Sequence, residues 1–323
     1  MIKLEKFKAV FLGFMMLCLP AVTSWAQEPF PTRPIDLVYP FAPGGGADVA
    51  TSMFKERVGK ILGQPLVSGY KPGGGGATAT AFVAMAKPDG YTILIGSNTG
   101  LITKPLTTRD LGYTMNDLTP ICNLTHSPLL WCVKEDGPFK TMQDLIRTAK
   151  SRKIKYASYG ALSMAHIAME AVGKAAGFQA IHVPYPGGGP AMAAALGGHV
   201  DVSVTSGTGG MVGPGRLRIL AVSTDTRFVS YPDVPTMREI GYPMNLDCYY
   251  YIWAPKGTPN ERIDKIYKAF KQARDDNKEA IEKFLVKSEH GLLLLSPEET
   301  LKLAREDHAR LKKIIEDMGV LIK

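Results

Sequence analysis

A glycine-rich loop between a short strand and a helix is the feature that most constrains this fold. The apolar run Ile35–Tyr39 predicts a strand, and Gly44-Gly45-Gly46 follows it closely. Apolar residues then recur at the spacing of one helix face, at Phe54, Val58, Ile61 and Leu62. Glycines let a ligand approach the main chain, and a helix N-terminus adds unpaired N–H groups and a positive dipole end. The loop is therefore either a tight connection or an anion site built from backbone.

The N-terminus has the three parts of a secretory signal peptide. Lys3, Lys6 and Lys8 give a basic start, residues 9–19 are apolar, and Ser24-Trp25-Ala26 is a small-x-small cleavage sequence. The apolar run is too short to cross a bilayer comfortably, which makes an uncleaved anchor the weaker alternative. We therefore expect cleavage after Ala26, and we expect the mature protein to be soluble and exported.

The charge of the chain is moderate and dispersed. Lys and Arg number 38 against 30 Asp and Glu, a net charge of +8, and the signal segment accounts for 3 Lys − 1 Glu = +2, which leaves +6. The basic residues form no dense tract and accompany no nucleic-acid motif, so we expect no nucleic-acid partner. A mild positive field suits the attraction of anionic solutes.

Two blocks of similar layout, residues 35–100 and 141–223, alternate short strands with helices. This pattern predicts an α/β fold with two mostly parallel sheets, one in each of two lobes. We expect residues 27–124 and 250–323 to form lobe 1, residues 125–249 to form lobe 2, and strands near residues 119–133 and 246–255 to cross between them. A ligand cleft would lie between the lobes, and we expect a monomer.

The C-terminal part is predicted to be helical. Thr258-Pro259-Asn260-Glu261 and Ser296-Pro297-Glu298-Glu299 each predict a helix start with a hydroxyl N-cap, proline at the first position and glutamate at the third.

Cys122 and Cys132 each lie five residues from Ser127, in a sequence that predicts a turn between two apolar runs. In a hairpin centred there the two cysteines would face each other, and an exported protein could join them as a disulfide. The alternative is a pair of buried thiols. Cys248 is expected to be a small buried apolar residue.

Motifs for catalysis are absent from the sequence: it has no Gly-x-Ser-x-Gly elbow, no His-Glu-x-x-His and no Walker loop. Gly74-x-Gly76-x-x-Ala79 loosely matches a dinucleotide fingerprint but is better explained as a helix-opening loop. His166 and Glu170 share a helix face without a third ligand at a supportive spacing. We therefore expect no catalytic residue, no metal and no cofactor. An exported hydrolase that uses Ser163 with His166 is the competing hypothesis.

Polar side chains recur where the predicted strands end, and ligands of parallel sheets bind at that edge. Ser97, Asn98 and Thr99 end one strand, Ser158 and Tyr159 another, and Thr205 and Ser206 a third. Hydroxyl, amide and main-chain N–H groups suit a carboxylate, and no nucleophile–base pair is evident among them. The pattern favours reversible binding over catalysis.

The chain contains many short motifs whose number and order resemble those of the Bug, or tripartite tricarboxylate transporter, family of periplasmic receptors, over nearly the full length of the chain. They are Tyr39-Pro40-Phe41-Ala42-Pro43-Gly44-Gly45-Gly46-Ala47-Asp48, Leu62-Gly63-Gln64-Pro65, Lys71-Pro72-Gly73-Gly74-Gly75, Pro88-Asp89-Gly90-Tyr91-Thr92, Tyr156-Ala157-Ser158, His166 with Glu170, His182-Val183-Pro184-Tyr185, Asp233-Val234-Pro235-Thr236 and Ala254-Pro255-Lys256-Gly257-Thr258-Pro259.

The resemblance implies a two-lobe, type II periplasmic binding fold that closes on a small carboxylate and delivers it to a membrane transporter of this tripartite type. It also implies that residues 41–48 and 159–163 grip the carboxylate. A sensor subunit with the same fold is a further alternative. Together the strand ends and the resemblance give these candidate ligand-binding residues: Phe41, Ala42, Gly44, Gly45, Asp48, Ser97, Asn98, Thr99, Ser158, Tyr159, Gly160, Ala161, Ser163, His166, Thr205 and Ser206.

The sequence departs from the usual family pattern at the cleft. Tyr159, Ala161 and Leu162 stand where small or polar residues are common, and Thr205-Ser206 replaces a frequent Asp-Asn pair. The missing acidic residue argues against an ammonium-bearing ligand. The added apolar groups favour an aromatic or medium-chain carboxylate over citrate or an amino acid.

Overall fold

The computed structural model describes residues 29–207, 210–244 and 246–319. Residues 31–323 form one compact unit. The predicted signal peptide and its cleavage site lie outside the described residues. Within the described part, the helices all lack the length and apolarity that a membrane crossing requires.

The first sheet has the strand order β11-β4-β10-β3-β1-β2. β1 runs parallel to β2 and β3, whereas β10 is antiparallel to β3 and β4, and β11 is antiparallel to β4. The strand bounds are β1 Ile35–Tyr39, β2 Leu66–Tyr70, β3 Thr92–Ser97, β4 Leu118–Ser127, β10 Cys248–Pro255 and β11 Gly291–Leu295. The helices near it are α2 Gly46–Leu62, α3 Ala77–Ala84, α4 Lys104–Thr107, α8 Asn260–Asp275, α9 Lys278–Lys287 and α10 Pro297–Asp317.

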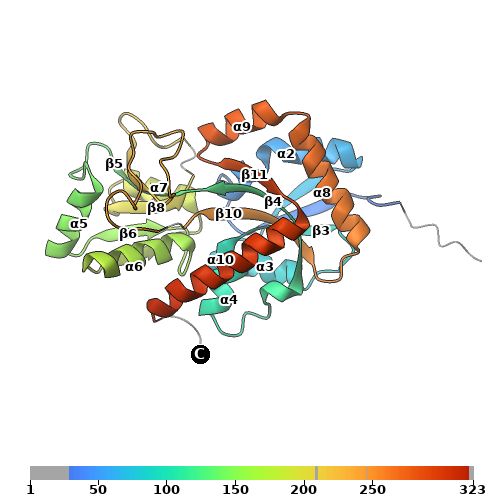
Figure 1. The fold of residues 1–323 in the computed structure, drawn as a ribbon, viewed down its shortest axis with the longest axis horizontal. Helices are drawn as coiled ribbons and strands as arrows, with labels where there is room; N and C mark the ends of the chain where they lie inside the picture. The colour runs from blue at the N-terminus through green and yellow to red at the C-terminus, as the bar shows by residue number, and fades with distance from the viewer. Residues whose placement is uncertain (1–28, 208–209, 245, 320–323) are drawn as a thin grey trace, which may run out of the picture. The chain divides into compact units, whose positions relative to one another are not determined.

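The second sheet has the order β7-β6-β8-β5-β9 and lies to the left in Figure 1 with its helices. β6 is parallel to β7 and β8, and β5 is antiparallel to β8 and β9. Its elements are β5 Leu129–Lys134, α5 Met142–Ser151, β6 Lys155–Ser158, α6 Met164–Ala176, β7 Ile181–Pro184, α7 Gly188–Leu196, β8 Val202–Ser206 and β9 Leu217–Val222. The two-sheet α/β prediction is confirmed, but both sheets are mixed rather than mostly parallel.

The chain passes between the sheets where it was expected to. β4 ends at Ser127 and β5 begins at Leu129, and the chain returns to the first sheet at Cys248, the first residue of β10. β4 and β10 thus reach slightly beyond the predicted lobe bounds, residues 27–124 with 250–323 and residues 125–249. Those bounds remain a prediction.

The predicted hairpin around Ser127 is wrong, and with it the disulfide. Cys122 pairs with Ile252 in the first sheet, whereas Cys132 pairs with Ser203 in the second. All three cysteines of the described residues are free and buried. Two apolar runs around a turn look alike in a sequence whether they pair with each other or with strands elsewhere.

We expect Cys122, Cys132 and Cys248 to react with iodoacetamide only after unfolding. Burial raises the pKa of all three thiols, that of Cys248 to about 11, so little thiolate is exposed at neutral pH. Mass spectrometry without reductant should show no rapid adduct on the native exported protein and three adducts in denaturant. Fewer than three adducts in denaturant would contradict this expectation and support a disulfide between Cys122 and Cys132.

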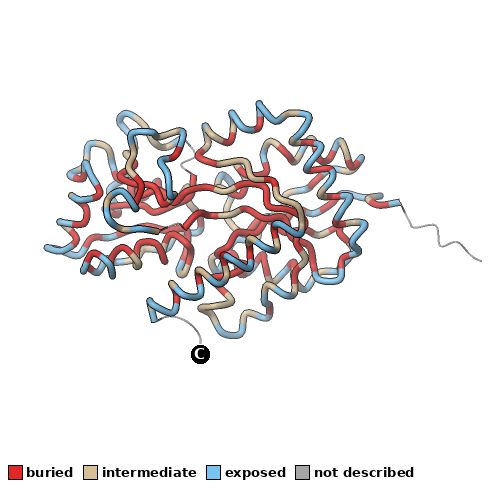
Figure 2. Tube along the Cα trace, viewed as in Figure 1, coloured by how far each residue is buried: buried red, intermediate tan, exposed pale blue. Residues whose placement is uncertain are grey.

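The core lies in the central strands, which are buried along most of their length in Figure 2. Trp131 of the second sheet and Trp253 of the first are both fully buried. The predicted apolar face of α2 is confirmed for Phe54, whose ring centroid lies 6.0 Å from that of Phe270 on α8. This packing holds α2, and therefore the loop before it, on the first sheet.

The two predicted helix starts differ in outcome. Ser296 caps α10 in a capping box with Glu299, as predicted. The N-cap of α8 is Pro259 instead of Thr258, whose hydroxyl donates to the carbonyl of Pro255, 2.7 Å away. The local turn therefore uses the hydroxyl that the sequence pattern assigned to the helix.

Candidate functional site

A cavity of about 420 Å³ lies between loops that follow strands of both sheets. Loops after β1 and β2 form one side with α4, and loops after β6 and β7 form the other. The lining residues are Phe41, Pro72, Gly73, Gly74, Gly75, Lys104, Tyr159, Gly160, Ala161, Pro184, Tyr185 and Pro186. Since these loops leave the carboxyl ends of parallel strands, the cavity occupies the edge at which α/β sheets bind ligands.

Glycines bring the two sides of the cavity close together. Gly160 has a φ of 135°, and a Cβ placed on it would lie 3.4 Å from the Cα of Gly75. Gly75 has a φ of 66°, and a Cβ there would lie only 2.6 Å from Cε of Lys104. Both positions therefore favour glycine for the backbone conformation, and Gly75 also needs it for the close approach of Lys104.

Apolar rings and prolines supply much of the remaining wall. The rings of Phe41 and Tyr159 meet edge to face, with centroids 5.6 Å apart, and so join the loop after β1 to the loop after β6. Of the candidate ligand-binding residues, four line the cavity: Phe41, Tyr159, Gly160 and Ala161.

Asp48 stabilises the loop between β1 and α2. Its Oδ2 accepts a hydrogen bond of 2.5 Å from the N–H of Gly44, and its Oδ1 accepts one of 2.7 Å from the hydroxyl of Tyr70. Burial, reinforced by Asp48, raises the pKa of Tyr70 to about 12. The carboxylate is thus engaged within its own loop, and it lies off the cavity lining.

Ser158 and Ser163 lie beneath the loop after β6, and both are fully buried. The Oγ of Ser158 shares a 2.7 Å hydrogen bond with Nε2 of His182, and that of Ser163 accepts from the N–H of His166 as the N-cap of α6. These bonds fix the loop that carries Tyr159, Gly160 and Ala161.

His166 serves the same loop and forms no nucleophile–base pair with Ser163. Its Nδ1 accepts a 2.8 Å hydrogen bond from the N–H of Leu162, a residue with a φ of 56°. Burial lowers the pKa of His166 and of His182 to about 4, and their rings stack with centroids 4.0 Å apart. His166 Nε2 is 3.8 Å from Glu170, and the described residues contain no metal-binding cluster.

The strand-end residues Ser97, Asn98, Thr99, Thr205 and Ser206 are all buried, and none of them lines the cavity. The amide of Asn98 donates to the carbonyl of Asp247 (2.8 Å) and to Asp307 (3.1 Å). Thr99 accepts from the N–H of Met164, and Ser206 shares a 2.8 Å hydrogen bond with Tyr250. The bonds of Thr99 and Ser206 tie elements of the two sheets together, whereas those of Asn98 stay on the side of the first sheet.

Some residues that line the cavity were not predicted from the sequence. They are Gly73–Gly75, Lys104 and residues 184–186. Lys104 is 7% exposed, and its Nζ donates a 2.6 Å hydrogen bond to the carbonyl of Ala161 on the opposite side. The available signal was a lysine before Pro105, two residues after the apolar pair Leu101-Ile102, in a segment that follows a strand.

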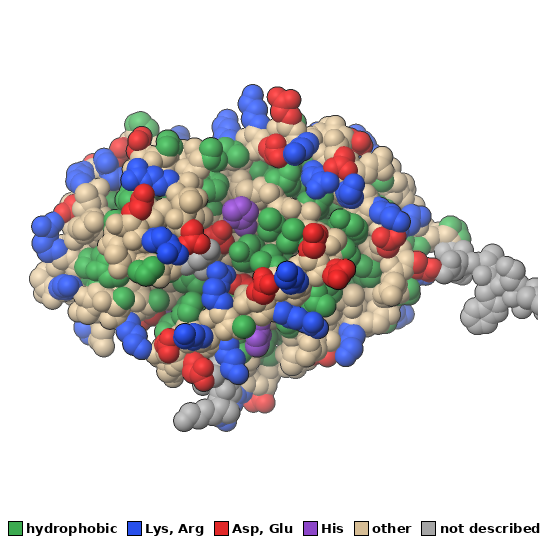
Figure 3. All heavy atoms as spheres, viewed as in Figure 1, with side chains coloured by type: hydrophobic (Ala, Val, Ile, Leu, Met, Phe, Trp, Pro, Cys, Tyr) green, Lys and Arg blue, Asp and Glu red, His purple; other side chains and the backbone are tan. Residues whose placement is uncertain are grey.

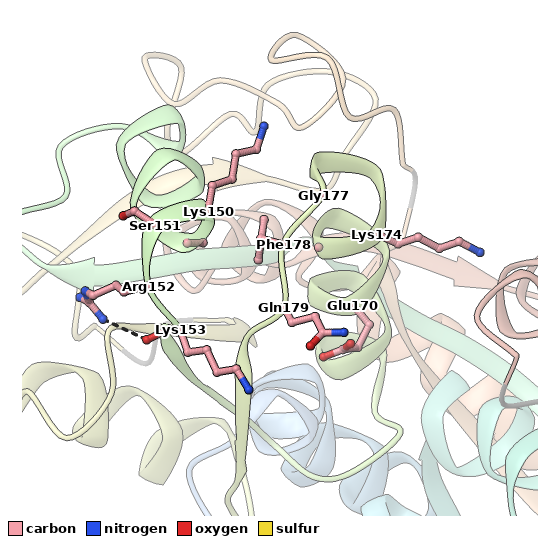
Figure 4. Close-up of a pocket in the computed structure, with 11 residues that line it drawn as sticks. Lys150, Ser151, Arg152, Lys153, Glu170, Lys174, Gly177, Phe178 and Gln179 are labelled. Carbon is pink, nitrogen blue, oxygen red and sulfur yellow. Dashed lines mark hydrogen bonds between the residues drawn. The ribbon is translucent and has the colours of Figure 1, made fainter.

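A larger cavity of about 710 Å³ lies on the second sheet's side of the protein, between the C-terminal ends of α5 and α6. Figure 4 shows the side chains of Lys150, Lys153 and Lys174 pointing in different directions, so they do not converge on one ligand. Both bounding helices present their negative dipole ends there, which disfavours an anion. The interlobe cavity is the better candidate.

The face in Figure 3 carries Lys, Arg, Asp and Glu side chains interspersed, without a block of one sign. This distribution agrees with the expectation from the sequence that the basic residues form no dense tract.

Comparison with known proteins decides the family. Residues 51–320 match the model of the tripartite tricarboxylate transporter family receptor. The chain belongs to this family. The receptor also resembles the solved periplasmic binding protein BugD, with 28% identity and a TM-score of 0.85 over 91% of this chain and 100% of the other.

Two further solved structures hold ligands. One, from Rhodopseudomonas palustris with adipate, is 27% identical with a TM-score of 0.85 over 90% of this chain and 99% of the other. The other, MatC from the same species with bound malate, is 26% identical with a TM-score of 0.82 over 88% and 100%. The predicted family and two-lobe binding fold are confirmed. The protein is a periplasmic solute receptor of a tripartite transporter, and the hydrolase hypothesis is wrong.

Proposed function

We propose that this receptor holds a small organic carboxylate in the cavity between its two sheets. The observation that carries the proposal is the cavity wall, which combines glycine backbone, one lysine and apolar rings and contains no Asp or Glu. Glycine backbone and an ammonium group suit a carboxylate. Phe41, Tyr159 and Tyr185 suit its carbon skeleton.

The two ligand-bound neighbours hold adipate and malate, which are both small carboxylates. They support the class of ligand without selecting one member of it. The wall of this cavity favours a medium-chain or aromatic acid over a short, fully polar one. In the same proposal the chain is cleaved after Ala26 and acts as a monomer that hands its ligand to the transporter.

Thermal melting of the exported protein with mono-, di- and tricarboxylates and aromatic acids tests the proposal. An acid present at about 100 times its dissociation constant adds roughly 2.7 kcal/mol to the free energy of unfolding, a readily visible shift. We expect one class of acid to raise the melting temperature clearly, and a panel without any response would overturn the proposal.

The variant Gly160→Val tests the location of the site. A side chain is strained at the φ of 135° of Gly160, and the valine would stand beside Gly75 in the cavity wall, so affinity for the responding acid should fall at least about tenfold, or 1.4 kcal/mol. Gly189→Val is the matched control, because a Cβ there meets no atom within 4 Å. Equal affinity in the two variants would place the ligand elsewhere.

A further inference from the structure

Lys104 is a buried cation without an acidic partner. It is 7% exposed, and the described residues place no Asp or Glu within ion-pair distance of its ammonium group. Its ammonium group donates a 2.6 Å hydrogen bond to a neutral acceptor, the carbonyl of Ala161. Burial lowers the pKa of Lys104, as expected for a charge removed from water without compensation.

An uncompensated buried charge is costly unless something pairs with it. An ammonium group has three N–H donors, and one carbonyl satisfies one of them. The two remaining N–H donors are on the Lys104 side chain, which lines the cavity. The group that would best complete this site is an anion inside the cavity.

The surrounding chain is arranged to hold Lys104 at this position. It begins α4, directly after the π-helical turn Thr99–Thr103. Thr103 donates a 2.9 Å hydrogen bond to the carbonyl of Leu162, beside the bond from Lys104 to Ala161. The absence of a side chain at Gly75 leaves the space through which Cε of Lys104 passes.

Lys104 also stands apart from the backbone groups that receive a first carboxylate in the proposed function. It comes from α4, whereas the glycine backbone of the cavity wall comes from the loops after β2 and β6, at Gly73–Gly75 and Gly160. The cavity wall therefore combines two kinds of polar group, neutral glycine backbone and a positively charged ammonium group.

We propose that Lys104 pairs with a second anionic group of the ligand, so that the receptor selects dicarboxylates over monocarboxylates of the same length. The inference rests on the proposed function and assigns the substrate class of that same site. The competing explanation is that Lys104 only ties the two sides together through Ala161.

Calorimetric titration with the straight-chain dicarboxylates from succinate to suberate, each compared with its own monoamide, separates these explanations. The monoamide keeps the length and polarity of the ligand and removes one charge. For the tightest-binding diacid we expect the wild-type protein to bind the monoamide roughly 30-fold to 1,000-fold more weakly, the range for losing one partner of a buried charge pair.

Lys104→Met should remove this preference. The variant is expected to bind the diacid more weakly by a similar factor and the monoamide within about threefold of the wild-type value. Lys71→Met is the matched control, because Lys71 lies over the ring of Phe82, outside the cavity lining, and should leave both affinities unchanged.

The outcomes distinguish the inference from the function on which it rests. If the wild-type protein binds none of the diacids, monoamides, aromatic acids and tricarboxylates, the proposed function fails. If it binds acids but treats diacid and monoamide alike, or if Lys104→Met keeps the preference, Lys104 is a structural tie and the inference is overturned. The ligand comparison in the wild-type protein decides even if Lys104→Met does not fold.

Discussion

Replacing Gly46 with alanine is expected to lower the midpoint of thermal unfolding by several degrees, whereas the same change at Gly45 should have little effect. A Cβ on Gly46 would lie 1.9 Å from the hydroxyl oxygen of Tyr250 and 2.7 Å from its Cζ. A Cβ on Gly45 would meet only the carbonyl oxygen of Ala42, at an ordinary 3.6 Å. The two glycines are adjacent at the start of α2, yet only Gly46 is needed for packing.

Tyr250 has little room to move away from the new methyl group. It is 2% exposed, it pairs with Ser97 and Thr125 within the first sheet, and its hydroxyl shares a 2.8 Å hydrogen bond with Ser206 of the second. Overpacking of this kind costs about 1–3 kcal/mol, and loss of the bond to Ser206 adds about 1 kcal/mol. Together these correspond to a destabilisation of roughly 3 kcal/mol.

A second substitution tests the cause. Tyr250→Phe removes the hydroxyl that the methyl group would strike, so Gly46→Ala with Tyr250→Phe should cost less than the sum of the two single changes. Gly45→Ala is the matched control and should stay within about 1 kcal/mol of the wild-type protein. Equal melting temperatures for Gly46→Ala and Gly45→Ala would mean that Tyr250 moves aside freely.

The local elements could be predicted well because their signals are local. The strand Ile35–Tyr39 and the helix after the glycines follow from an apolar run and a helical period, and the structure has the same strand bounds. The strands with which β4 and β5 pair could not be predicted. β4 pairs with β10, and β5 pairs with β8 and β9, and these partners lie about 70 or more residues later in the chain. A turn sequence such as that around Ser127 does not record whether the flanking strands share a sheet.

The residues of the site also include some that could be predicted from the sequence and some that could not. Phe41 and Gly160 could be found because they follow strands, at the edge where ligands of α/β sheets bind. Ser158 satisfied the same rule, yet its hydroxyl is directed to His182 and supports the loop. Lys104 follows a π-helical turn instead of a strand, and only the folded chain shows that it reaches Ala161.

Stability is expected to fall as the pH is lowered from 7.5 to 5, with His290 responsible for roughly 2 kcal/mol of the loss. Burial lowers the pKa of His290 from 6.5 to about 4, and its neighbour His126 adds to the effect. The unfolded chain therefore takes up a proton near pH 6.5, whereas the folded protein resists it until about pH 4. The contribution of His290 is complete above pH 6.5 and is lost as the pH falls toward 4.

The size of the effect follows from the gap between the two pKa values. At about 1.36 kcal/mol per pH unit, the 1.5 units between pH 5 and the unfolded pKa of 6.5 stabilise the unfolded state by roughly 2 kcal/mol, whereas the folded state is still mostly unprotonated at His290. His290 is fully buried, its ring centroid lies 5.3 Å from that of Tyr250, and Nδ1 is hydrogen-bonded to the carbonyl of Ser288, so a charged ring at this position would be removed from water.

His290→Asn tests this assignment, because the asparagine amide can donate to the carbonyl of Ser288 but does not titrate. Urea unfolding at pH 7.5, 6.5, 5.5 and 5.0 should show a lower stability at pH 7.5 and a pH-dependent loss smaller than that of the wild-type protein by roughly 2 kcal/mol. His166 and His182, whose pKa values burial also lowers to about 4, and His308, whose pKa burial also lowers, contribute to the remaining loss. The exposed His199, changed to asparagine, is the control and should follow the wild-type curve. Parallel curves for His290→Asn and the wild-type protein would show that the folded state accepts the proton at His290 as readily as the unfolded chain does.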